Sequence, residues 1–273
     1  MKAIVFDGKQ ARFDAAYPMP QPGEGESLIR ILLAAVCSTD REILKGYRPQ
    51  FQGVMGHEFV GEVVAGGDET LLGQLVVGEL NINCGHCLYC KTGREHHCLT
   101  RRVPGLDGKD GCFAAYMAYP TRLLHTVPQG LKPQQAVFCE PLAAALQICE
   151  TTHIPPSTRV AILGDGRLAL MVAQAIAANG TPLVVFGRHP EKLALFRPFA
   201  DVATIPQGSF EVVVDATGNP DALPTSIGLT RSGGTLCLKS TYAGDANVNM
   251  SEIVVREITV RGSRCGPFEP ALN

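Results

Sequence analysis

The sequence predicts two domains, a β-barrel-like domain followed by a doubly wound parallel α/β domain. Three observations lead to this prediction. The 273 residues suffice for about two domains with cores of their own. Residues 1 to about 135 carry short apolar runs separated by glycine and proline, a pattern typical of all-β domains. From the turn at 155–158 onward, apolar strands alternate with helical stretches, as in an α/β fold.

Composition and charge indicate an ordinary globular protein. Hydrophobic residues make up 45% of the chain and charged residues 18%, and the formal net charge is −2. A charge so close to neutral gives no reason to expect nucleic acid or an acidic membrane as a partner. The first ten residues carry no signal-peptide core, and no segment approaches the length of a membrane span. We therefore expect a cytoplasmic protein.

The first domain is expected over residues 1–148. Its strands are predicted at the apolar runs 2–6, 27–36, 58–66, 73–80, 114–120 and 123–128. Glycine and proline punctuate the segments between these runs, which favours short antiparallel strands.

Residues 84–98, CGHCLYCKTGREHHC, predict a metal lobe at about 81–101. Cytosolic thiols stay reduced, so ten cysteines are better explained by metal ligation than by disulfides. The spacing C-x2-C-x2-C-x7-C suits a tetrahedral zinc ion whose four thiolates leave no position for substrate. The predicted ligands are Cys84, Cys87, Cys90 and Cys98.

Two alternatives to a structural zinc site were weighed for this lobe. The cysteines could be free or redox-active thiols, although their spacing favours zinc. A DNA-binding finger would need a recognition helix and a basic face, whereas the segment after Cys98 is interrupted by Pro104 and several glycines. The neighbouring histidines are expected to be solvated loop residues; they are His86, His96 and His97.

The second domain is expected over residues 149–273 as a six-stranded dinucleotide-binding sheet. Its strands are predicted near 159–164, 182–187, 201–205, 211–218, 233–240 and 257–263. The long apolar stretch 167–180 predicts the helix after the first strand, with Gly180 as its stop.

The turn LGDGRLAL, residues 163–170, matches the G-x-G-x-x-A form of a phosphate-binding loop. Its glycines allow the backbone to turn and to approach a pyrophosphate at the helix N-terminus. Glycines also end strands for structural reasons, but the strand before and the helix after favour the binding role. The candidate cofactor-binding residues are Gly164, Gly166, Leu168 and Ala169.

The end of the second strand of this sheet predicts which cofactor is preferred. NAD sites usually place Asp or Glu there, whereas this chain has Gly187, Arg188 and His189. Arg188 and His189 could pair with a 2′-phosphate, and no carboxylate at this place would repel it. We therefore expect NADP to be favoured over NAD. The alternative is that both side chains simply face solvent.

Further metal-ligand residue types occur in VCSTD (36–40), GHEFVGEV (56–63) and FCEPLAAAL (138–146). With the four-cysteine lobe, the G-x-G-x-x-A turn and LKSTYAG (238–244), these motifs resemble the zinc-dependent medium-chain dehydrogenases in the same order along the chain. The resemblance covers essentially the whole chain. It implies a GroES-like β-barrel catalytic domain followed by a Rossmann domain.

The resemblance also implies a second, catalytic zinc ion and a set of residues around it. Its protein ligands would be Cys37, His57 and Glu140, with Glu58 adjoining the metal, although Cys139 stands beside Glu140. A fourth position would take the substrate oxygen, and zinc would lower the pKa of the substrate hydroxyl. Thr39 would begin the proton relay and Asp40 would orient the imidazole of His57. Glu42 stands where many relatives continue that relay with histidine.

The expected function is hydride transfer between a small alcohol or polyol and a nicotinamide cofactor, by a homodimer or homotetramer. The alternative is a nucleotide-binding or regulatory protein that keeps the fold without turnover. Residues 269–272 are expected to begin a helix. Members of the resembled family continue that helix and return to the first domain, so we expect the chain to be C-terminally truncated, with an apolar groove exposed on that domain.

Overall fold

The computed structural model describes residues 1–242 and 245–273, and within them the chain divides into two compact units. Unit 1 comprises Met1–Glu140 and Phe268–Asn273, and unit 2 comprises Pro141–Pro267. Ala243 and Gly244, which end the LKSTYAG motif, lie outside the described residues. Each helix in the described part of the chain is too short or too polar to cross a membrane.

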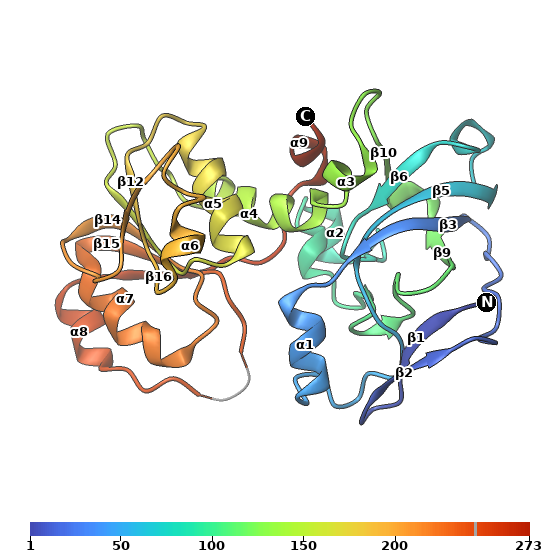
Figure 1. Cartoon of the computed structure of the whole chain (residues 1–273), viewed down its shortest axis with the longest axis horizontal. Helices are drawn as coiled ribbons and strands as arrows, with labels where there is room; N and C mark the ends of the chain where they lie inside the picture. Colours follow the sequence, from blue (N-terminus) through green and yellow to red (C-terminus); the bar gives the residue numbers. More distant parts are fainter. Residues whose placement is uncertain (243–244) are drawn as a thin grey trace. The chain divides into compact units, whose positions relative to one another are not determined.

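Unit 1 is built on antiparallel β-sheets (Figure 1). The larger sheet has the strand order β10-β6-β5-β3-β9, and a smaller one has the order β2-β1-β4. Their bounds are β1 Ala3–Phe6, β2 Ala11–Asp14, β3 Glu26–Ala35, β4 Gly53–Val54, β5 Glu58–Gly66, β6 Leu75–Gly78, β9 Tyr116–Pro120 and β10 Leu124–Thr126. Two further short strands, β7 Val103–Pro104 and β8 Gly108–Lys109, pair with each other.

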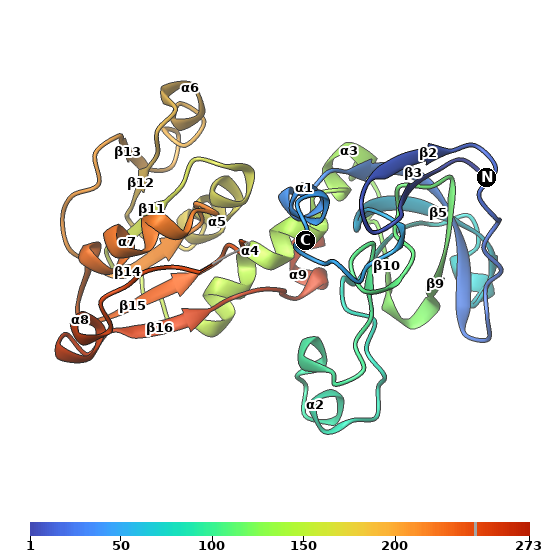
Figure 2. The same cartoon turned by 90° about the horizontal axis from the view of Figure 1, so that it is seen from below.

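The core of unit 1 lies against the larger sheet. Ile29 of β3, Val63 of β5, Val76 of β6 and Met117 of β9 are all buried in one cluster. The helices of this unit are short: α1 Ser38–Leu44, α2 Leu88–Lys91, α3 Pro133–Ala136 and α9 Phe268–Leu272, with 3-10 turns η1 Glu69–Leu71, η2 Glu95–His97 and η3 Thr121–Leu123. The segment that carries α2 stands out from the sheets of the unit (Figure 2).

Unit 2 is a parallel six-stranded sheet with the order β13-β12-β11-β14-β15-β16. Its strands are β11 Val160–Leu163, β12 Leu183–Phe186, β13 Asp201–Ala203, β14 Phe210–Asp215, β15 Thr230–Leu238 and β16 Thr259–Gly262. Counted along the chain, this is the order 3-2-1-4-5-6 of a doubly wound dinucleotide-binding sheet. The strand order reverses between β11 and β14, and such folds bind ligands at the carboxyl ends of the strands there.

Side chains of β11 alternate between two cores, one on each face of the sheet. Val160 and Ile162 join the cluster that includes Val172 of α5, whereas Ala161 and Leu163 join the cluster that includes Ile227 of α7. The helices of this unit are α4 Cys139–Thr151, α5 Arg167–Ala177, α6 Pro190–Leu193, α7 Leu223–Leu229 and α8 Met250–Val255, with the 3-10 turn η4 Pro220–Ala222. Because both faces are covered, the strands read as continuous apolar runs.

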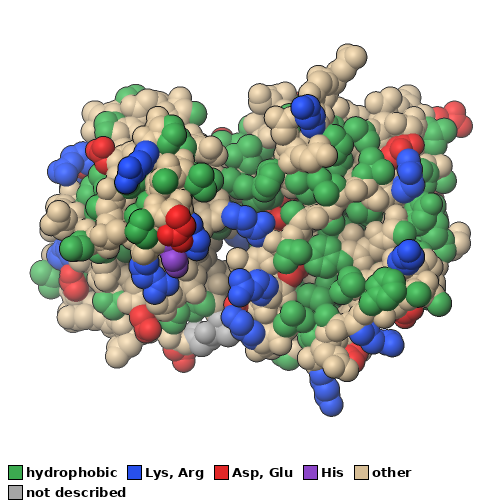
Figure 3. All heavy atoms as spheres, viewed as in Figure 1, with side chains coloured by type: hydrophobic (Ala, Val, Ile, Leu, Met, Phe, Trp, Pro, Cys, Tyr) green, Lys and Arg blue, Asp and Glu red, His purple; other side chains and the backbone are tan. Residues whose placement is uncertain are grey.

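The surface of unit 2 agrees with the nearly neutral charge of the chain. Acidic and basic side chains are interspersed on the face of the unit that Figure 3 shows.

The predicted fold class, a barrel-like antiparallel domain followed by a doubly wound domain, is confirmed. The structure divides the chain after Glu140 rather than after residue 148, because Ala145 and Ile148 of α4 are already buried in the core of unit 2. It also assigns residues 268–273 to unit 1, where the ring of Phe268 stacks on His125 with centroids 5.8 Å apart. The helix expected at 269–272 is present as α9.

Truncation of Ile162 tests the packing of the central strand. Ile162→Ala removes a fully buried side chain from β11 and should lower the free energy of unfolding by about 2–5 kcal/mol. Ile205→Ala is the matched control, because Ile205 is 71% exposed and should change stability by less than about 0.5 kcal/mol. Denaturant unfolding followed by circular dichroism measures both, and equal losses would contradict the assigned core.

Candidate metal centres and cofactor site

The four predicted lobe cysteines come together in the structure. The sulfurs of Cys84, Cys87, Cys90 and Cys98 all lie within 4.8 Å of one another, and none of the four forms a disulfide. Cys87 Sγ lies 3.5 Å from Cys90 Sγ, and Cys84 Sγ lies 3.9 Å from Cys90 Sγ. A tetrahedral zinc site with Zn–S bonds of about 2.3 Å places neighbouring sulfurs about 3.8 Å apart, so the geometry fits zinc.

Local backbone geometry and hydrogen bonds hold these sulfurs together. Gly85 and Gly93 have positive φ angles of 76° and 70°, which let the chain turn tightly between the ligands. The backbone N–H of Cys84 donates to Cys98 Sγ, and that of Cys87 donates to Cys84 Sγ, each at 3.3 Å. Such amide donors stabilise thiolates.

The surroundings of the thiols shift their pKa values in opposite directions. Backbone amides of His86 and Cys87 lower the pKa of Cys84 to about 5. Burial and the neighbouring thiols raise the pKa of Cys90 to about 12. Four thiolates at this separation would repel one another strongly, so full ionisation requires a cation at their centre.

The nearby histidines do not belong to the sulfur cluster. His86 Nδ1 lies 2.8 Å from the carbonyl oxygen of Cys84, and the rings of His96 and His97 lie 4.1 Å apart. The metal-ligand group found among the described residues of this lobe contains cysteine alone.

A second group of potential metal ligands consists of Cys37, His57 and Glu58. Their ligand atoms all lie within 4.8 Å of one another. Pairing of β3 with β5 sets Ala35 opposite Glu58, so Cys37, two residues beyond β3, reaches the residues that begin β5. His57 and Glu58 are only 4% and 2% exposed, which removes their side chains from bulk water.

Asp40, in the first turn of α1, connects the two strands that form this group. Its Oδ2 accepts the backbone N–H of Cys37 at 2.8 Å, and its Oδ1 lies 3.4 Å from His57 Nδ1. Burial lowers the pKa of His57, but the side chains of Asp40 and Cys37 and the charge of Glu140 outweigh it and hold that pKa well above its usual value. The surroundings of His57 therefore favour positive charge, and the sulfur, imidazole and carboxylate donors fit a zinc ion.

Glu140 and Cys139 lie at the start of α4, and neither is a member of this group. The resemblance implied Glu140 as the third ligand with Glu58 beside it, whereas the structure brings Glu58 within 4.8 Å of both other ligands. Cys139 Sγ lies 3.7 Å from the carbonyl oxygen of Phe268, and burial raises its pKa to about 12. Cys139 is thus a neutral thiol directed at that carbonyl.

The two residues considered for the proton relay have different neighbours. Thr39 Oγ1 lies 3.6 Å from Cys37 Sγ, which places the hydroxyl beside the ligand group. Glu42 lies one turn further along α1 and forms an ion pair of 2.7 Å with Lys45. The carboxylate of Glu42 is therefore engaged by Lys45.

The phosphate-loop residues stand at the carboxyl end of β11. Gly164 has a φ of 120°, and a Cβ there would lie 2.7 Å from the carbonyl oxygen of Ala216, so only glycine fits between β11 and β14. Gly166 is the N-cap of α5 and has open space around its Cβ direction. Ala169 is buried and Leu168 packs against the same core, so these two hold the helix on the sheet. The loop thus has the free space and the helix N-terminus that a pyrophosphate needs.

Arg188 and His189 follow β12. Their backbone is bound by a residue of the phosphate loop that the sequence analysis did not single out. Asp165, between the two loop glycines, accepts the backbone N–H groups of both at 2.7 and 2.8 Å. Its place between the two loop glycines was the available signal in the sequence. Arg188 itself is exposed.

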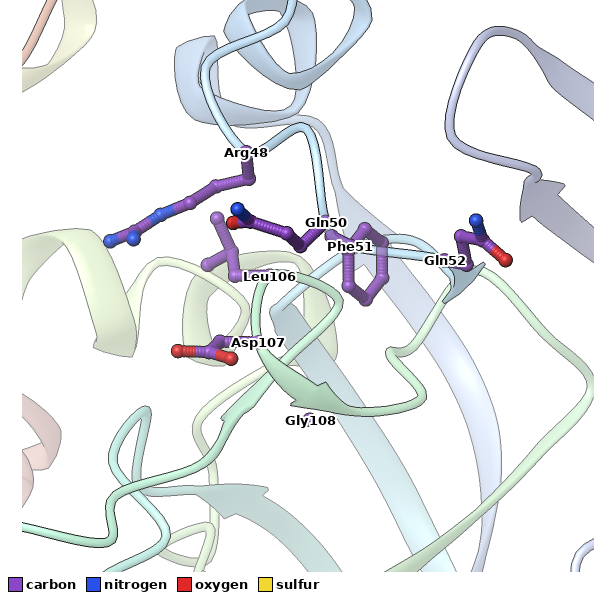
Figure 4. Close-up of a pocket in the computed structure, with 7 residues that line it drawn as sticks. All are labelled: Arg48, Gln50, Phe51, Gln52, Leu106, Asp107 and Gly108. Carbon is purple, nitrogen blue, oxygen red and sulfur yellow. The ribbon is translucent and has the colours of Figure 1, made fainter.

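A polar pocket of about 440 Å³ lies in unit 1. Arg48 from the segment after α1 and Asp107 from the loop between β7 and β8 extend their charged ends toward the same side of it (Figure 4). Phe51 and Leu106 form its apolar floor and belong to a buried cluster with Met55. None of Cys37, His57 and Glu58 is among the residues that line this pocket.

Two protein-family models match the chain. A model described as the alcohol dehydrogenase GroES-like domain matches residues 23–129, and one described as zinc-binding dehydrogenase matches residues 166–272. The erythritol/L-threitol dehydrogenase of Mycolicibacterium smegmatis is 30% identical over 98% of this chain and 84% of its own length. The L-threonine 3-dehydrogenase of Bacillus licheniformis is 30% identical over 96% of this chain and 83% of its own length.

Solved structures show the same fold. A zinc-binding dehydrogenase from Sinorhizobium meliloti with NADP bound has a TM-score of 0.88 and 28% identity, covering 99% of this chain and 86% of that one. An alcohol dehydrogenase from Escherichia coli with NADH bound has a TM-score of 0.89, covering all of this chain and 86% of that one. At 24% identity, the second supports the fold alone.

Replacing Gly164 tests the close approach of β11 and β14. Gly164→Ala forces both an unfavourable φ and a contact with the carbonyl of Ala216, so we expect a loss of about 1–3 kcal/mol in the free energy of unfolding. Gly218→Ala is the control, because Gly218 also has a positive φ of 65° but no atom within 4 Å of the added Cβ. Thermal unfolding should show the larger drop for Gly164→Ala, and equal drops would argue against the close contact.

Proposed function

The chain belongs to the zinc-dependent medium-chain dehydrogenase family. From this membership we propose that it oxidises a small polyhydroxylated alcohol. A zinc ion would be held by Cys37, His57 and a carboxylate, and NADP would be the preferred hydride acceptor. The single observation that carries the proposal is the ligand group of Cys37, His57 and Glu58, of which His57 and Glu58 are buried. Dehydrogenase names among the relatives support this reading over the alternative of a binding protein without turnover.

A zinc ion bound there would act as a Lewis acid that lowers the pKa of the substrate hydroxyl and so promotes hydride transfer to the nicotinamide. The residues of the chain then have separate tasks. Cys37 and His57 would hold the ion, and Asp40 orients His57 through the 3.4 Å approach to Nδ1. Thr39, with its hydroxyl 3.6 Å from Cys37 Sγ, is the proposed first acceptor of the substrate proton.

Glu58 and Glu140 share the proposed carboxylate role. Glu58 supplies the carboxylate in the ligand group as it stands. Glu140 acts on His57 through its charge and is the proposed third ligand when Glu58 leaves. With either carboxylate, Cys37 and His57 would give the ion three protein ligands and leave a fourth position for the substrate.

The four-cysteine lobe has a structural role in this proposal. Four thiolates close a tetrahedral shell, so an ion bound by Cys84, Cys87, Cys90 and Cys98 takes no part in hydride transfer. Such an ion would instead stabilise a lobe that stands out from the sheets (Figure 2).

The cofactor is proposed to lie across the carboxyl ends of β11 and β12. Its pyrophosphate would rest on the open backbone at Gly166 and on the N-terminus of α5. Arg188 and His189 would meet the 2′-phosphate of NADP, since neither Asp nor Glu directly follows β12. Discrimination between NADP and NAD then depends on these two side chains.

The substrate is proposed to be a polyol or a hydroxylated acid. The names of relatives include erythritol, L-threitol, L-galactonate and L-threonine, all small molecules with several polar groups. Arg48 and Asp107 offer both charges on one side of the pocket, which suits such molecules better than a purely apolar alcohol (Figure 4). Reduction of NADP+ followed by absorbance, over a panel of these compounds and simple alkanols, tests this class directly.

Zinc content tests the two metal sites separately. We expect about two zinc ions per chain in the purified protein, and about one each in Cys37→Ala and Cys90→Ala, because the two ligand groups share no residue. Cys90→Ala should also lower the melting temperature, whereas Cys37→Ala should abolish alcohol oxidation with little loss of stability. Cys149→Ala, a half-buried thiol outside both groups, should keep both ions.

Elemental analysis of the protein and its three variants measures these numbers. Loss of both ions, or of neither, in Cys37→Ala would contradict separate sites.

Cofactor binding tests the role of Arg188. A well-placed charged contact is worth about 1.5–3 kcal/mol, so Arg188→Ala should weaken NADPH binding about tenfold or more and change NADH binding much less. Arg197→Ala is the matched control, since Arg197 is an exposed arginine of the same unit that follows α6. Fluorescence titration gives the four dissociation constants, and equal weakening of both cofactors would remove Arg188 from the proposed role.

A further inference from the structure

Asp165 lies between the two glycines of the phosphate loop, and its side chain is only 11% exposed. A single carboxylate oxygen, Oδ2, receives three N–H groups from the turn that follows β12. The donors are the backbone N–H of Arg188 at 2.7 Å, the backbone N–H of His189 at 2.8 Å and the ring Nδ1 of His189 at 2.9 Å. One side chain of the phosphate loop therefore fixes the backbone of both basic residues proposed to meet the 2′-phosphate.

Gly187 shows how closely Asp165 fits beneath this turn. A Cβ at Gly187 would lie 2.6 Å from Asp165 Cβ and 2.7 Å from Asp165 Oδ2. Any larger residue would force Asp165 out of its place, because Leu193 Cδ2 closes the other side at 2.9 Å. The glycine that ends β12 and the aspartate of the G-D-G turn are thus two parts of one arrangement.

The charge state of Asp165 supports the same arrangement. Burial raises the pKa of this carboxyl, but the backbone N–H and ring of His189 and the backbone N–H of Arg188 outweigh that effect and lower it below its usual value. Asp165 is therefore ionised at neutral pH, and it is directed at the turn rather than left to solvent.

The contact with Asp165 also orients the imidazole of His189. Because Nδ1 lies against the buried carboxylate while the side chain of His189 is 43% exposed, the opposite edge with Nε2 is the part that faces outward. Lys192 Nζ lies 3.5 Å from the same Nδ1 and adds a third basic group to the turn. The outward edge of the ring therefore presents Nε2, whereas the carboxylate of Asp165 and the ammonium of Lys192 both lie at the Nδ1 edge.

We propose that Asp165 is a positioning residue for cofactor discrimination: it anchors the Arg188–His189 backbone and the inner edge of the His189 ring, so that both basic side chains face the 2′-phosphate of NADP. This inference rests on the proposed function, because it concerns the same nicotinamide cofactor. It assigns the discrimination to a residue of the pyrophosphate loop, one strand away from the residues that would touch the 2′-phosphate. The loop and the turn then act as one unit toward the cofactor.

The opposite role would also use an ionised carboxylate. If Asp165 reached the adenosine ribose hydroxyls, it would act as the acidic residue of an NAD site and would repel a 2′-phosphate. The three N–H groups on Oδ2 favour the anchoring role, and removing the carboxylate distinguishes the two by the sign of its effect.

The test compares Asp165→Ala and Asp165→Asn with the unchanged protein and with Glu191→Gln. Glu191 is an exposed carboxylate of the same turn region, so its neutralisation controls for the loss of one negative charge. Dissociation constants for NADPH, NADH, 2′,5′-ADP and 5′-AMP are measured on the zinc-loaded full chain by calorimetry. The nitrogen chemical shifts of the His189 ring report its tautomer, and thermal unfolding reports whether each variant is folded.

We expect Asp165→Ala to lower the preference for NADPH over NADH, and for 2′,5′-ADP over 5′-AMP, by about tenfold, the loss of one charged contact. Asp165→Asn keeps an acceptor for the backbone N–H groups and should lose about threefold, roughly half of that free energy. In the neutral ring, the proton should favour Nδ1 in the unchanged protein and redistribute toward Nε2 in Asp165→Ala. Glu191→Gln should leave both the preference and the ring unchanged.

Three results would overturn the inference. Equal weakening of both cofactors would make Asp165 a structural residue only, and a gain in NADPH preference would make it an NAD determinant. An unchanged preference, whatever the ring reports, would show that cofactor discrimination does not need Asp165. If Asp165→Ala fails to fold, the same three outcomes are read from Asp165→Asn.

The unchanged protein separates this inference from the proposed function. Equal binding of NADPH and NADH by it would overturn the proposed cofactor preference, and the His189 ring would still report whether Asp165 anchors the turn. A clear NADPH preference that survives in Asp165→Ala would overturn the present inference alone.

Discussion

The antiparallel pairing of β3 with β5 is the constraint on which the candidate catalytic metal centre depends. It sets Ala35 opposite Glu58, so the chain leaves one strand at Cys37 where it enters the other at His57. Asp40 then ties the two ends together by accepting the N–H of Cys37 and approaching His57 Nδ1. A shift of register by one residue would turn every side chain of β5 to the opposite face and would separate these residues.

Burying this group is unfavourable for stability, which indicates that it serves function. Asp40 and Glu58 are each 2% exposed, and removing a carboxylate from water costs several kcal/mol unless its charge is compensated. The raised pKa of His57 reflects the same excess of negative charge. A divalent cation at these donors would compensate the buried negative charge, which fits the group to a metal-binding role.

Unit 2 depends on an analogous close contact at the carboxyl ends of its strands. Gly164 lets β11 approach the carbonyl of Ala216, and Gly187 lets Asp165 fit beneath the turn after β12. Both glycines therefore serve contacts between segments distant in the sequence. The phosphate loop, the turn with Arg188 and His189, and the end of β14 consequently form one rigid edge of the sheet for a cofactor to meet.

The sequence by itself determined the features that depend on local spacing and periodicity. The order of apolar runs predicted both folds, the C-x2-C-x2-C-x7-C spacing predicted the sulfur cluster, and the G-x-G-x-x-A turn predicted the loop at Gly164. These predictions are confirmed because each pattern lies within one short segment, where backbone geometry determines which residues come together. The structure divides the chain after Glu140 rather than after residue 148, because apolar residues of α4 already pack in the core of unit 2.

Only the tertiary structure decided how residues from different segments combine. It brought Glu58, rather than Glu140, within 4.8 Å of Cys37 and His57, and it turned Cys139 toward the carbonyl of Phe268. It also placed Asp165 under Arg188 and His189, a contact across 23 and 24 residues of sequence. Strand register and side-chain direction determine such contacts, and they arise from packing among elements far apart along the chain, where local spacing carries no information.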